Sequence, residues 1–254
     1  MEFRRNIEDK LKAWSQSPFR KPLVLRGARQ VGKTTAVKQF AVNYEQFIYL
    51  NLETDDAKSF EGERDIHKIV DRIFFLKDGE KGKADTLIFI DEIQEVPSAL
   101  NMLRYFYEEY PEYHVIAAGS LLESLFDRDV SFPVGRVDYL YMYPFTFGEF
   151  LEALGEKNAL NAYRQVPVPD YAVDKLMQLF HTYTLVGGMP EAVYRYVVTK
   201  DLSQVKPVYD SLLLSYLDDV EKYAKTTNQM QVMRHCIRSC FAEAGERIKF
   251  AGFG

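Results

Sequence analysis

The stretch L-V-L-R-G-A-R-Q-V-G-K-T, from Leu23 to Thr34, decides the fold of this chain of 254 residues. Its apolar start, Leu23–Leu25, predicts a strand, which leads into the pattern G-x-x-x-x-G-K-T over Gly27–Thr34. Glycines at both ends let the backbone curl until several N–H groups point at one phosphate, and a helix that begins near Lys33 adds the positive end of its dipole. The stretch therefore predicts a strand, loop and helix that together bind phosphate.

This loop predicts a nucleoside triphosphate as the ligand. Lys33 would reach the β- and γ-phosphates, and the Thr34 hydroxyl would ligate Mg²⁺. The alternative is a chance match in a surface loop, but the chain has the strand before the loop and the helical pattern after it that the motif requires. The residues expected to bind the nucleotide are Gly27, Ala28, Arg29, Gln30, Val31, Gly32, Lys33, Thr34 and Thr35.

A second apolar run, Thr86–Ile90, ends in the acidic pair Asp91-Glu92. Such a run is typical of a central parallel strand whose carboxyl end opens on the ligand crevice. Asp91 would hold Mg²⁺, and Glu92 would orient or deprotonate the water that attacks the γ-phosphate. A solvated acidic turn is the alternative for this pair taken alone. Together with the phosphate loop, the pair predicts an ATPase that hydrolyses its nucleotide.

Further apolar runs alternate with helical patterns along the first part of the chain. This alternation predicts an α/β fold with a parallel sheet. The expected strands are Phe47–Leu52, Tyr113–Ala118 and Val137–Tyr143, and the expected helices are Met1–Trp14, Lys33–Val42, Asp65–Leu76, Pro97–Tyr110 and Leu121–Phe126.

Two more residues are candidates for contact with the γ-phosphate. Ser120 follows the strand Tyr113–Ala118, and it would either sense the phosphate or cap the next helix. Arg136 opens the strand Val137–Tyr143, and it would stabilise charge on the transferred phosphoryl group in its own site or in a neighbour's. The alternative for Arg136 is a surface arginine that pairs with Asp138 or another carboxylate.

Five segments together resemble one known family. The chain is similar to the AAA+-related prokaryotic ATPases that pair an ATPase core with a helical lid, a winged helix and a C-terminal domain of uncertain function. The resemblance runs from about Arg4 to the last residue. It is carried by RGARQVGKTT (Arg26–Thr35), LIFIDEIQ (Leu87–Gln94), AAGSLL (Ala117–Leu122), GRV-x-YLYMYP-x-TF-x-EFL (Gly135–Leu151) and GGMPEAV (Gly187–Val193).

The resemblance implies a strand order of 5-1-4-3-2, with the strand before Ser120 between the P-loop strand and the acidic strand. It also implies ATP, and the chain lacks the N-K-x-D or T-K-x-D element that reads guanine. We therefore expect ATP and ADP as ligands, with Mg²⁺.

Three domains are expected. Residues 1–155 would form the P-loop ATPase core with its N-terminal helix, residues 156–225 a helical lid, and residues 226–254 the incomplete beginning of a winged helix, as in a truncated chain. The boundary near residue 155 rests on a stretch to Pro169 where the apolar periodicity fails. Gly187–Pro190 would be a hinge between two helices or simply a helix stop followed by a helix start. The resemblance implies that this motif lies near the nucleotide, but the residues alone assign it no contact.

The composition of the chain bears on its expected location in the cell and on its expected partners. No apolar run approaches the ~20 residues of a membrane span, so we expect a cytoplasmic protein without a membrane partner. The net charge is −5, although basic residues outnumber acidic ones from Glu221 onward. That region would contact DNA or a protein partner, or it is a charged packing surface. Tyr139–Tyr143 is interpreted as alternation on a core strand, and the two cysteines as core residues in a reducing compartment.

These features predict Mg²⁺-dependent ATP binding and hydrolysis coupled to conformational change, acting on DNA or a protein partner. The alternative is a nucleotide-dependent regulatory switch with negligible hydrolysis. A small-molecule kinase is disfavoured because the chain has no visible acceptor site. A homo-oligomer remains open at this point.

Overall fold

The computed structural model of the protein describes residues 3–120, 135–224, 226–243 and 247. The chain divides into two compact units, Met1–Val193 and Tyr194–Gly254. The helix expected at Leu121–Phe126 lies outside the described residues.

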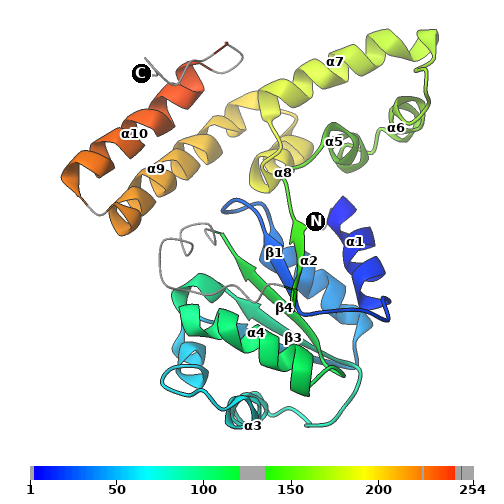
Figure 1. Ribbon diagram of the computed structural model, residues 1–254. Coiled ribbons are helices and arrows are strands. Elements are labelled where there is room, and N and C mark those ends of the chain that lie inside the picture. The colour runs from blue at the N-terminus through cyan, green and yellow to red at the C-terminus, as the bar shows by residue number, and fades with distance from the viewer. Residues whose placement is uncertain (1–2, 121–134, 225, 244–246, 248–254) are drawn as a thin grey trace. The chain divides into compact units, whose positions relative to one another are not determined.

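One parallel sheet forms the centre of the first unit (Figure 1). Its order is β2-β3-β4-β1-β5, and each neighbouring pair is parallel. The expected order 5-1-4-3-2 is the same order read from the other edge, and it is confirmed. β4, the strand before Ser120, lies between the P-loop strand β1 and the acidic strand β3. The strands are β1 (Leu23–Arg26), β2 (Gln46–Asn51), β3 (Thr86–Asp91), β4 (His114–Gly119) and β5 (Asp138–Tyr141).

Helices cover both faces of this sheet. One face carries α1 (Asn6–Ser15) and α2 (Lys33–Phe40), and the other carries α3 (Ile66–Leu76) and α4 (Pro97–Glu109) (Figure 1). A parallel sheet needs this double cover because its strands are apolar on both sides. Short 3-10 helices connect the elements at Ala41–Asn43 (η1), Asp55–Ser59 (η2) and Ile93–Glu95 (η3).

The main core lies between the sheet and the helices α3 and α4. Ile48, Ile88 and Val115 point from neighbouring strands into this layer, and Ile69 and Leu103 meet them from the two helices. All of these side chains are almost fully buried. Burial of one such aliphatic side chain stabilises the fold by roughly 1.5–3 kcal/mol, so this layer fixes where the strands end.

A smaller helical layer completes the first unit. It contains α5 (Phe147–Ala153), α6 (Lys157–Tyr163), α7 (Asp170–Val186) and the start of α8 (Pro190–Thr199). The sequence showed no apolar periodicity between residues 155 and 169, yet the structure has α6 in this stretch. Three apolar residues of this short helix, Ala159, Leu160 and Ala162, pack with residues of α5 and α7. The helix is too short to show periodicity in the sequence, so its tertiary contacts define it.

The second unit is helical. It contains the rest of α8, a 3-10 turn (η5, Leu202–Gln204), α9 (Lys206–Tyr223) and α10 (Thr227–Ala242). Arg234 Nη2 of α10 lies 2.6 Å from Glu221 Oε1 of α9. The expected boundaries at residues 155 and 225 differ from the division at 193, and the three domains and the winged helix stay predictions. The interpretation of the cysteines as core residues was wrong for Cys240, which is exposed.

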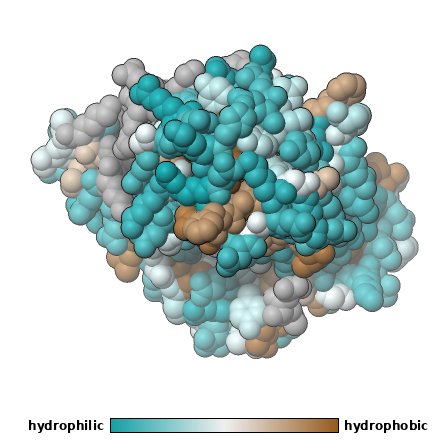
Figure 2. Space-filling model, turned by 90° about the horizontal axis from the view of Figure 1, so that it is seen from below, coloured by the Kyte–Doolittle hydropathy of each residue, from teal (hydrophilic) through white to brown (hydrophobic). Residues whose placement is uncertain are grey.

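Several apolar side chains of the described residues are exposed, and Figure 2 shows one largely hydrophilic face on which hydrophobic residues appear in places. The expected alternation is present, since Tyr139, Tyr141 and Tyr143 are exposed while Met142 is buried, but β5 is an edge strand of the sheet rather than a core strand. Among the described residues, no helix has the length and apolar character that crossing a membrane requires.

Candidate nucleotide-binding site

A cavity of about 350 Å³ opens at the carboxyl ends of β1 and β3. It brings together residues that follow three different strands, because parallel strands all end at the same edge of the sheet. Gly32 has a left-handed backbone (φ 94°) and ends the loop, and α2 begins at Lys33 directly behind it. The cavity is lined by Arg29, Gln30, Gly32, Lys33, Thr34, Thr35, Glu92, Ser120, Pro190 and Glu191.

Gly27 fixes the beginning of the loop. A Cβ atom at this position would lie 2.3 Å from the carbonyl oxygen of Met142. Met142 follows β5, and its N–H donates to the Arg26 carbonyl at 2.8 Å. The backbone of the loop therefore approaches the neighbouring backbone so closely that only glycine fits. The first glycine of the motif serves this close approach as well as the phosphate cradle.

Lys33 is buried at the base of the loop. Its Nζ donates to the carbonyl oxygens of Gly27 at 2.9 Å and Ala28 at 3.0 Å. Burial lowers the pKa of Lys33, although the nearby carboxylates of Glu92 and Asp91 oppose the shift. An anion in this cavity would offset the desolvation of the ammonium group, so the site favours a negatively charged ligand.

Thr34, which lines the cavity, is in direct contact with Asp91 at the end of β3. Thr34 Oγ1 donates to Asp91 Oδ2 at 2.7 Å, and the Tyr49 hydroxyl donates to the same oxygen at 3.3 Å. Burial raises the pKa of Asp91, and these hydrogen bonds work against the shift. Burial, followed by the charge of Asp91, raises the pKa of Tyr49 to about 12. The tyrosine thus stays a neutral donor to the carboxylate.

The hydroxyl and carboxylate of this pair fit Mg²⁺. Magnesium prefers oxygen ligands and keeps several of its waters, so it needs only one or two protein groups beside the phosphates. Within the described part of the chain, no three His, Cys, Asp or Glu side chains are grouped as a metal cage. A site built for a fully protein-bound metal would need more ligands than Thr34 and Asp91 supply.

Glu92 lines the cavity in a strained conformation. Its backbone is left-handed (φ 53°, ψ 44°), which is uncommon for a residue other than glycine and costs on the order of 1–3 kcal/mol. Its Oε2 accepts a hydrogen bond from Gln94 Nε2 at 2.6 Å. Gln94 is itself buried, so it holds the carboxylate in a defined position. Such strain is often found at functional sites.

Ser120 and Arg136, the two other candidates for contact with the γ-phosphate, lie in different places. Ser120 lines the cavity, as a phosphate sensor would, and the helix that it would cap instead lies outside the described residues. Arg136 precedes β5 and so lies at the amino end of the sheet, opposite the P-loop. Its Nε donates to Glu108 Oε1 at 2.9 Å, and the group is exposed. From this position it would reach a phosphate only in a neighbouring chain.

Sequence reasoning missed two sets of residues at the site. Pro190 and Glu191, at the start of α8, line the cavity, although no contact was assigned to Gly187–Pro190. The Gly188 carbonyl accepts from the Phe145 N–H at 2.7 Å, which fixes this segment. Arg5 and Glu149 form a buried ion pair beneath the loop. The T-x-x-E pattern that ends in Glu149 was the available signal, because it predicts a helix start with a fixed carboxylate.

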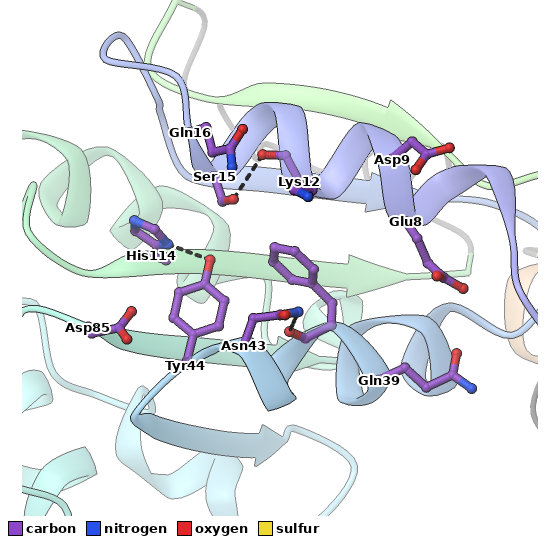
Figure 3. A pocket seen from close by; sticks show the side chains of 11 residues that line it. Glu8, Asp9, Lys12, Ser15, Gln16, Gln39, Asn43, Tyr44, Asp85 and His114 are labelled. Atoms are coloured by element: carbon purple, nitrogen blue, oxygen red, sulfur yellow. Dashed lines mark hydrogen bonds between the residues drawn. The ribbon is translucent and has the colours of Figure 1, made fainter.

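A second cavity, of about 480 Å³, lies at the other end of α2 (Figure 3). Its polar side chains do not converge, since Glu8 and Asp9 lie near one end of the view and Asp85 near the other. On the Asp85 side of the view, His114 Nδ1 is hydrogen-bonded to the Tyr44 hydroxyl, so both groups are already paired. The larger cavity is therefore the poorer candidate for a polar ligand.

Comparisons with known proteins agree with this geometry. Residues 19–151, more than half of the chain, match the family model of the AAA domain. The chain therefore belongs to the AAA domain family, and its fold is that of the AAA-type P-loop ATPases. Residues 177–253 match a domain of unknown function (DUF8612). The comparison with curated proteins gave no match.

Solved structures also resemble this chain. The Walker-type ATPase PABY2304 of Pyrococcus abyssi is 18% identical, with a TM-score of 0.57, over 98% of this chain and 86% of its own. The structure of Drosophila ORC bound to DNA (15% identity, TM-score 0.45, 94% of this chain and 67% of that chain) matches more weakly. The structure of C. elegans PCH-2 also matches more weakly (14% identity, TM-score 0.46, 94% of this chain and 69% of that chain). At these identities the first likeness concerns the fold alone, and the other two carry no argument.

Proposed function

We propose that this chain binds ATP with Mg²⁺ and hydrolyses it. One observation carries the proposal: a single cavity holds Lys33, Thr34 and Glu92, with Asp91 hydrogen-bonded to Thr34 at 2.7 Å. These are the groups that phosphoryl transfer to water requires, namely a cation, a metal site and a carboxylate for the attacking water. The AAA-type ATPase fold, which binds nucleotides, supports this proposal.

Each residue has a distinct part in the proposed reaction. The loop Gly27–Thr35 and the Lys33 ammonium bind the β- and γ-phosphates. Thr34 and Asp91 hold Mg²⁺, which would neutralise charge on the phosphate oxygens. Glu92 orients a water against the γ-phosphate and accepts its proton. Ser120, on the same cavity, would contact the γ-phosphate or that water.

We propose further that the reaction is coupled to movement of the helices. α8 begins at the cavity with Pro190 and Glu191 and continues into the second unit, so a change at the γ-phosphate would reach α8 directly. The partner would be DNA or a protein that contacts the C-terminal region. A cytoplasmic location and a homo-oligomer, in which Arg136 reaches a neighbour's phosphate, belong to the same proposal.

A second function is favoured by the contact between Gln94 and Glu92. The Gln94 amide holds the Glu92 carboxylate at 2.6 Å, and a carboxylate held in this way is restrained from orienting water. In this alternative the chain is a nucleotide-dependent switch that binds ATP and ADP with negligible hydrolysis. Release of Glu92 from Gln94 would then be the step that a partner controls.

Single-turnover hydrolysis of ATP tests the proposal. We expect Glu92→Gln to bind ATP with a Kd within about threefold of the unchanged chain and to hydrolyse it 10²–10⁴-fold more slowly, since a general base contributes about that much. Glu95→Gln, three residues further and exposed, is the matched control and should hydrolyse normally. A chelator of Mg²⁺ should abolish turnover, and duplex DNA should stimulate it if DNA is the partner.

Two outcomes would contradict hydrolysis by Glu92. If both chains bind ATP and neither turns it over, the switch function is favoured. If Glu92→Gln hydrolyses as fast as the unchanged chain, then another group activates the water.

A further inference from the structure

A buried ion pair joins the N-terminus of the first unit to its helical layer. Arg5 Nε lies 3.0 Å from Glu149 Oε1, and the two side chains are only 7% and 4% exposed. Two charges taken out of water need their hydrogen bonds satisfied, because desolvation otherwise outweighs their attraction. The hydrogen-bond partners of each group therefore indicate the role of the ion pair.

The carboxylate of Glu149 is fully occupied. Its Oε1 accepts from Arg5 Nε and from the Asn6 N–H at 2.7 Å, and its Oε2 accepts from the Thr146 N–H at 2.8 Å and hydroxyl at 3.1 Å. Burial by itself would raise the pKa of Glu149, but these hydrogen bonds and the Arg5 charge outweigh burial and lower it. Glu149 therefore stays an anion and gives Arg5 a fixed anchor.

Arg5 uses its remaining N–H groups on two other segments. Nη1 donates to the Val31 carbonyl at 3.2 Å, and Nη2 donates to the Tyr143 carbonyl at 2.8 Å. The guanidinium also lies over the Phe145 ring, 3.9 Å from its centroid. A planar guanidinium can contact three acceptors in fixed directions at once, which a lysine ammonium on a flexible stem does not reproduce.

The contact with Val31 reaches the phosphate loop itself. The Val31 carbonyl and the Gly32 N–H belong to one planar trans peptide, in which C=O and N–H point in opposite directions. When Arg5 holds the carbonyl on its own side, the Gly32 N–H must point to the other side. Gly32 lines the cavity, and its N–H is one of the groups expected to bind phosphate.

We infer that Arg5 is a positioning residue for the nucleotide site: anchored by Glu149, it orients the Val31–Gly32 peptide and so sets the affinity for a nucleoside di- or triphosphate. The inference rests on the proposed function, because it concerns the same cavity. It assigns to the N-terminal segment a part in phosphate binding that the loop motif does not include.

Affinity for ATP and ADP, measured by titration calorimetry beside the melting temperature, tests this inference. Arg5→Lys keeps the positive charge for Glu149 but cannot span the three acceptors. We expect it to melt within a few degrees of the unchanged chain and to bind both nucleotides about tenfold more weakly. The double variant R5M/E149L removes both charges together, and we expect a larger loss of affinity.

Arg4→Met is the matched control. Arg4 is adjacent, but it is exposed and pairs with Asp9 at 3.2 Å, so its removal should leave both affinity and melting temperature unchanged. If Arg5→Lys and the double variant bind as tightly as the unchanged chain, the pair is only structural and the inference is overturned. If the double variant does not fold, Arg5→Lys alone decides. Failure of the unchanged chain to bind either nucleotide would instead overturn the proposed function, and this inference with it.

Discussion

The two cavities at opposite ends of α2 differ in how their polar side chains are arranged, and this arrangement distinguishes a candidate binding site from an ordinary surface cavity. The cavity at the start of α2 is the smaller, about 350 Å³ against about 480 Å³. Yet it is lined by Lys33, Thr34 and Glu92 together, with Asp91 hydrogen-bonded to Thr34. The cavity at the end of α2 has Glu8 and Asp9 toward one end, and Asp85 with the paired His114 and Tyr44 toward the other (Figure 3). Convergence of polar groups, rather than volume, defines the site.

The backbone shows the same difference. At the start of α2, Gln30 (φ 63°) and Glu92 (φ 53°) line the cavity. Both residues have a left-handed backbone conformation, which costs energy. At its end, Phe40 and Tyr44 meet edge to face, and the Tyr44 ring meets His114 in the same way. These aromatic contacts join the end of α2 and the segment after it to the start of β4. The backbone is therefore strained beside the start of α2, whereas the residues at its end make ordinary packing contacts.

The largest difference in ATP affinity is expected between two lysine variants, one at each end of α2. Lys33→Met should weaken ATP binding about 100-fold, because a charge-assisted contact with phosphate in a partly buried site is worth up to about 3 kcal/mol. Lys12→Met, at the other cavity, should leave the Kd within about twofold. Calorimetric titration with ATP would measure both. Equal losses in the two variants would break the distinction between the cavities.

An intermediate effect is expected from pH at the end of α2. Burial, helped by the charge of Arg20, lowers the pKa of His114 from 6.5 to about 4. The folded chain then binds fewer protons than the unfolded chain, so this group lowers stability as the pH falls from about 6.5 to about 4. This pKa shift corresponds to a loss of at most ~3 kcal/mol in the free energy of unfolding. Because His114 is partly exposed, we expect a loss of ~1–2 kcal/mol.

His114→Gln isolates this contribution, because glutamine can still bond to the Tyr44 hydroxyl but does not titrate. Denaturant unfolding of both chains at pH 7 and pH 4 gives the difference in stability loss. We expect the variant to lose ~1–2 kcal/mol less than the unchanged chain, with ATP affinity at pH 7 unaltered. A change in ATP affinity would mean that the two ends of α2 are coupled.

The smallest effect is expected at Arg136, which lies at the amino end of the sheet with its side chain on Glu108. Arg136→Met should leave the melting temperature and the ATP affinity of dilute protein unchanged, since exposed ion pairs contribute little. Turnover measured across a range of protein concentrations tests the proposed role in a neighbouring chain. A fall in turnover that appears only at high concentration would support that role, and a fall in dilute protein would contradict the geometry described above.

The sequence predicted most local elements of the sheet and the residues that are proposed for the site. The spacing from Gly27 to Thr34 and the run before Asp91 were sufficient, because a strand followed by glycines or carboxylates has few other uses. The alternation of strands and helices gave a parallel sheet, and the resemblance supplied its order. Even the start of α3 was readable, since the Asp65 carboxylate accepts from the His67 N–H at 2.9 Å.

Only the tertiary structure decided which distant residues support the loop. The sequence assigned no role at the site to Arg5 or Glu149, and it allowed Gly188 to be part of a simple helix stop. Their roles arise because the sheet brings the N-terminal segment, the segment after β5 and the start of α8 to the same edge. Local patterns depend on neighbours three or four residues away, whereas a contact between residues 5 and 149 depends on the whole fold. That is why the motif predicted the ligand, and the packing revealed what holds the motif in place.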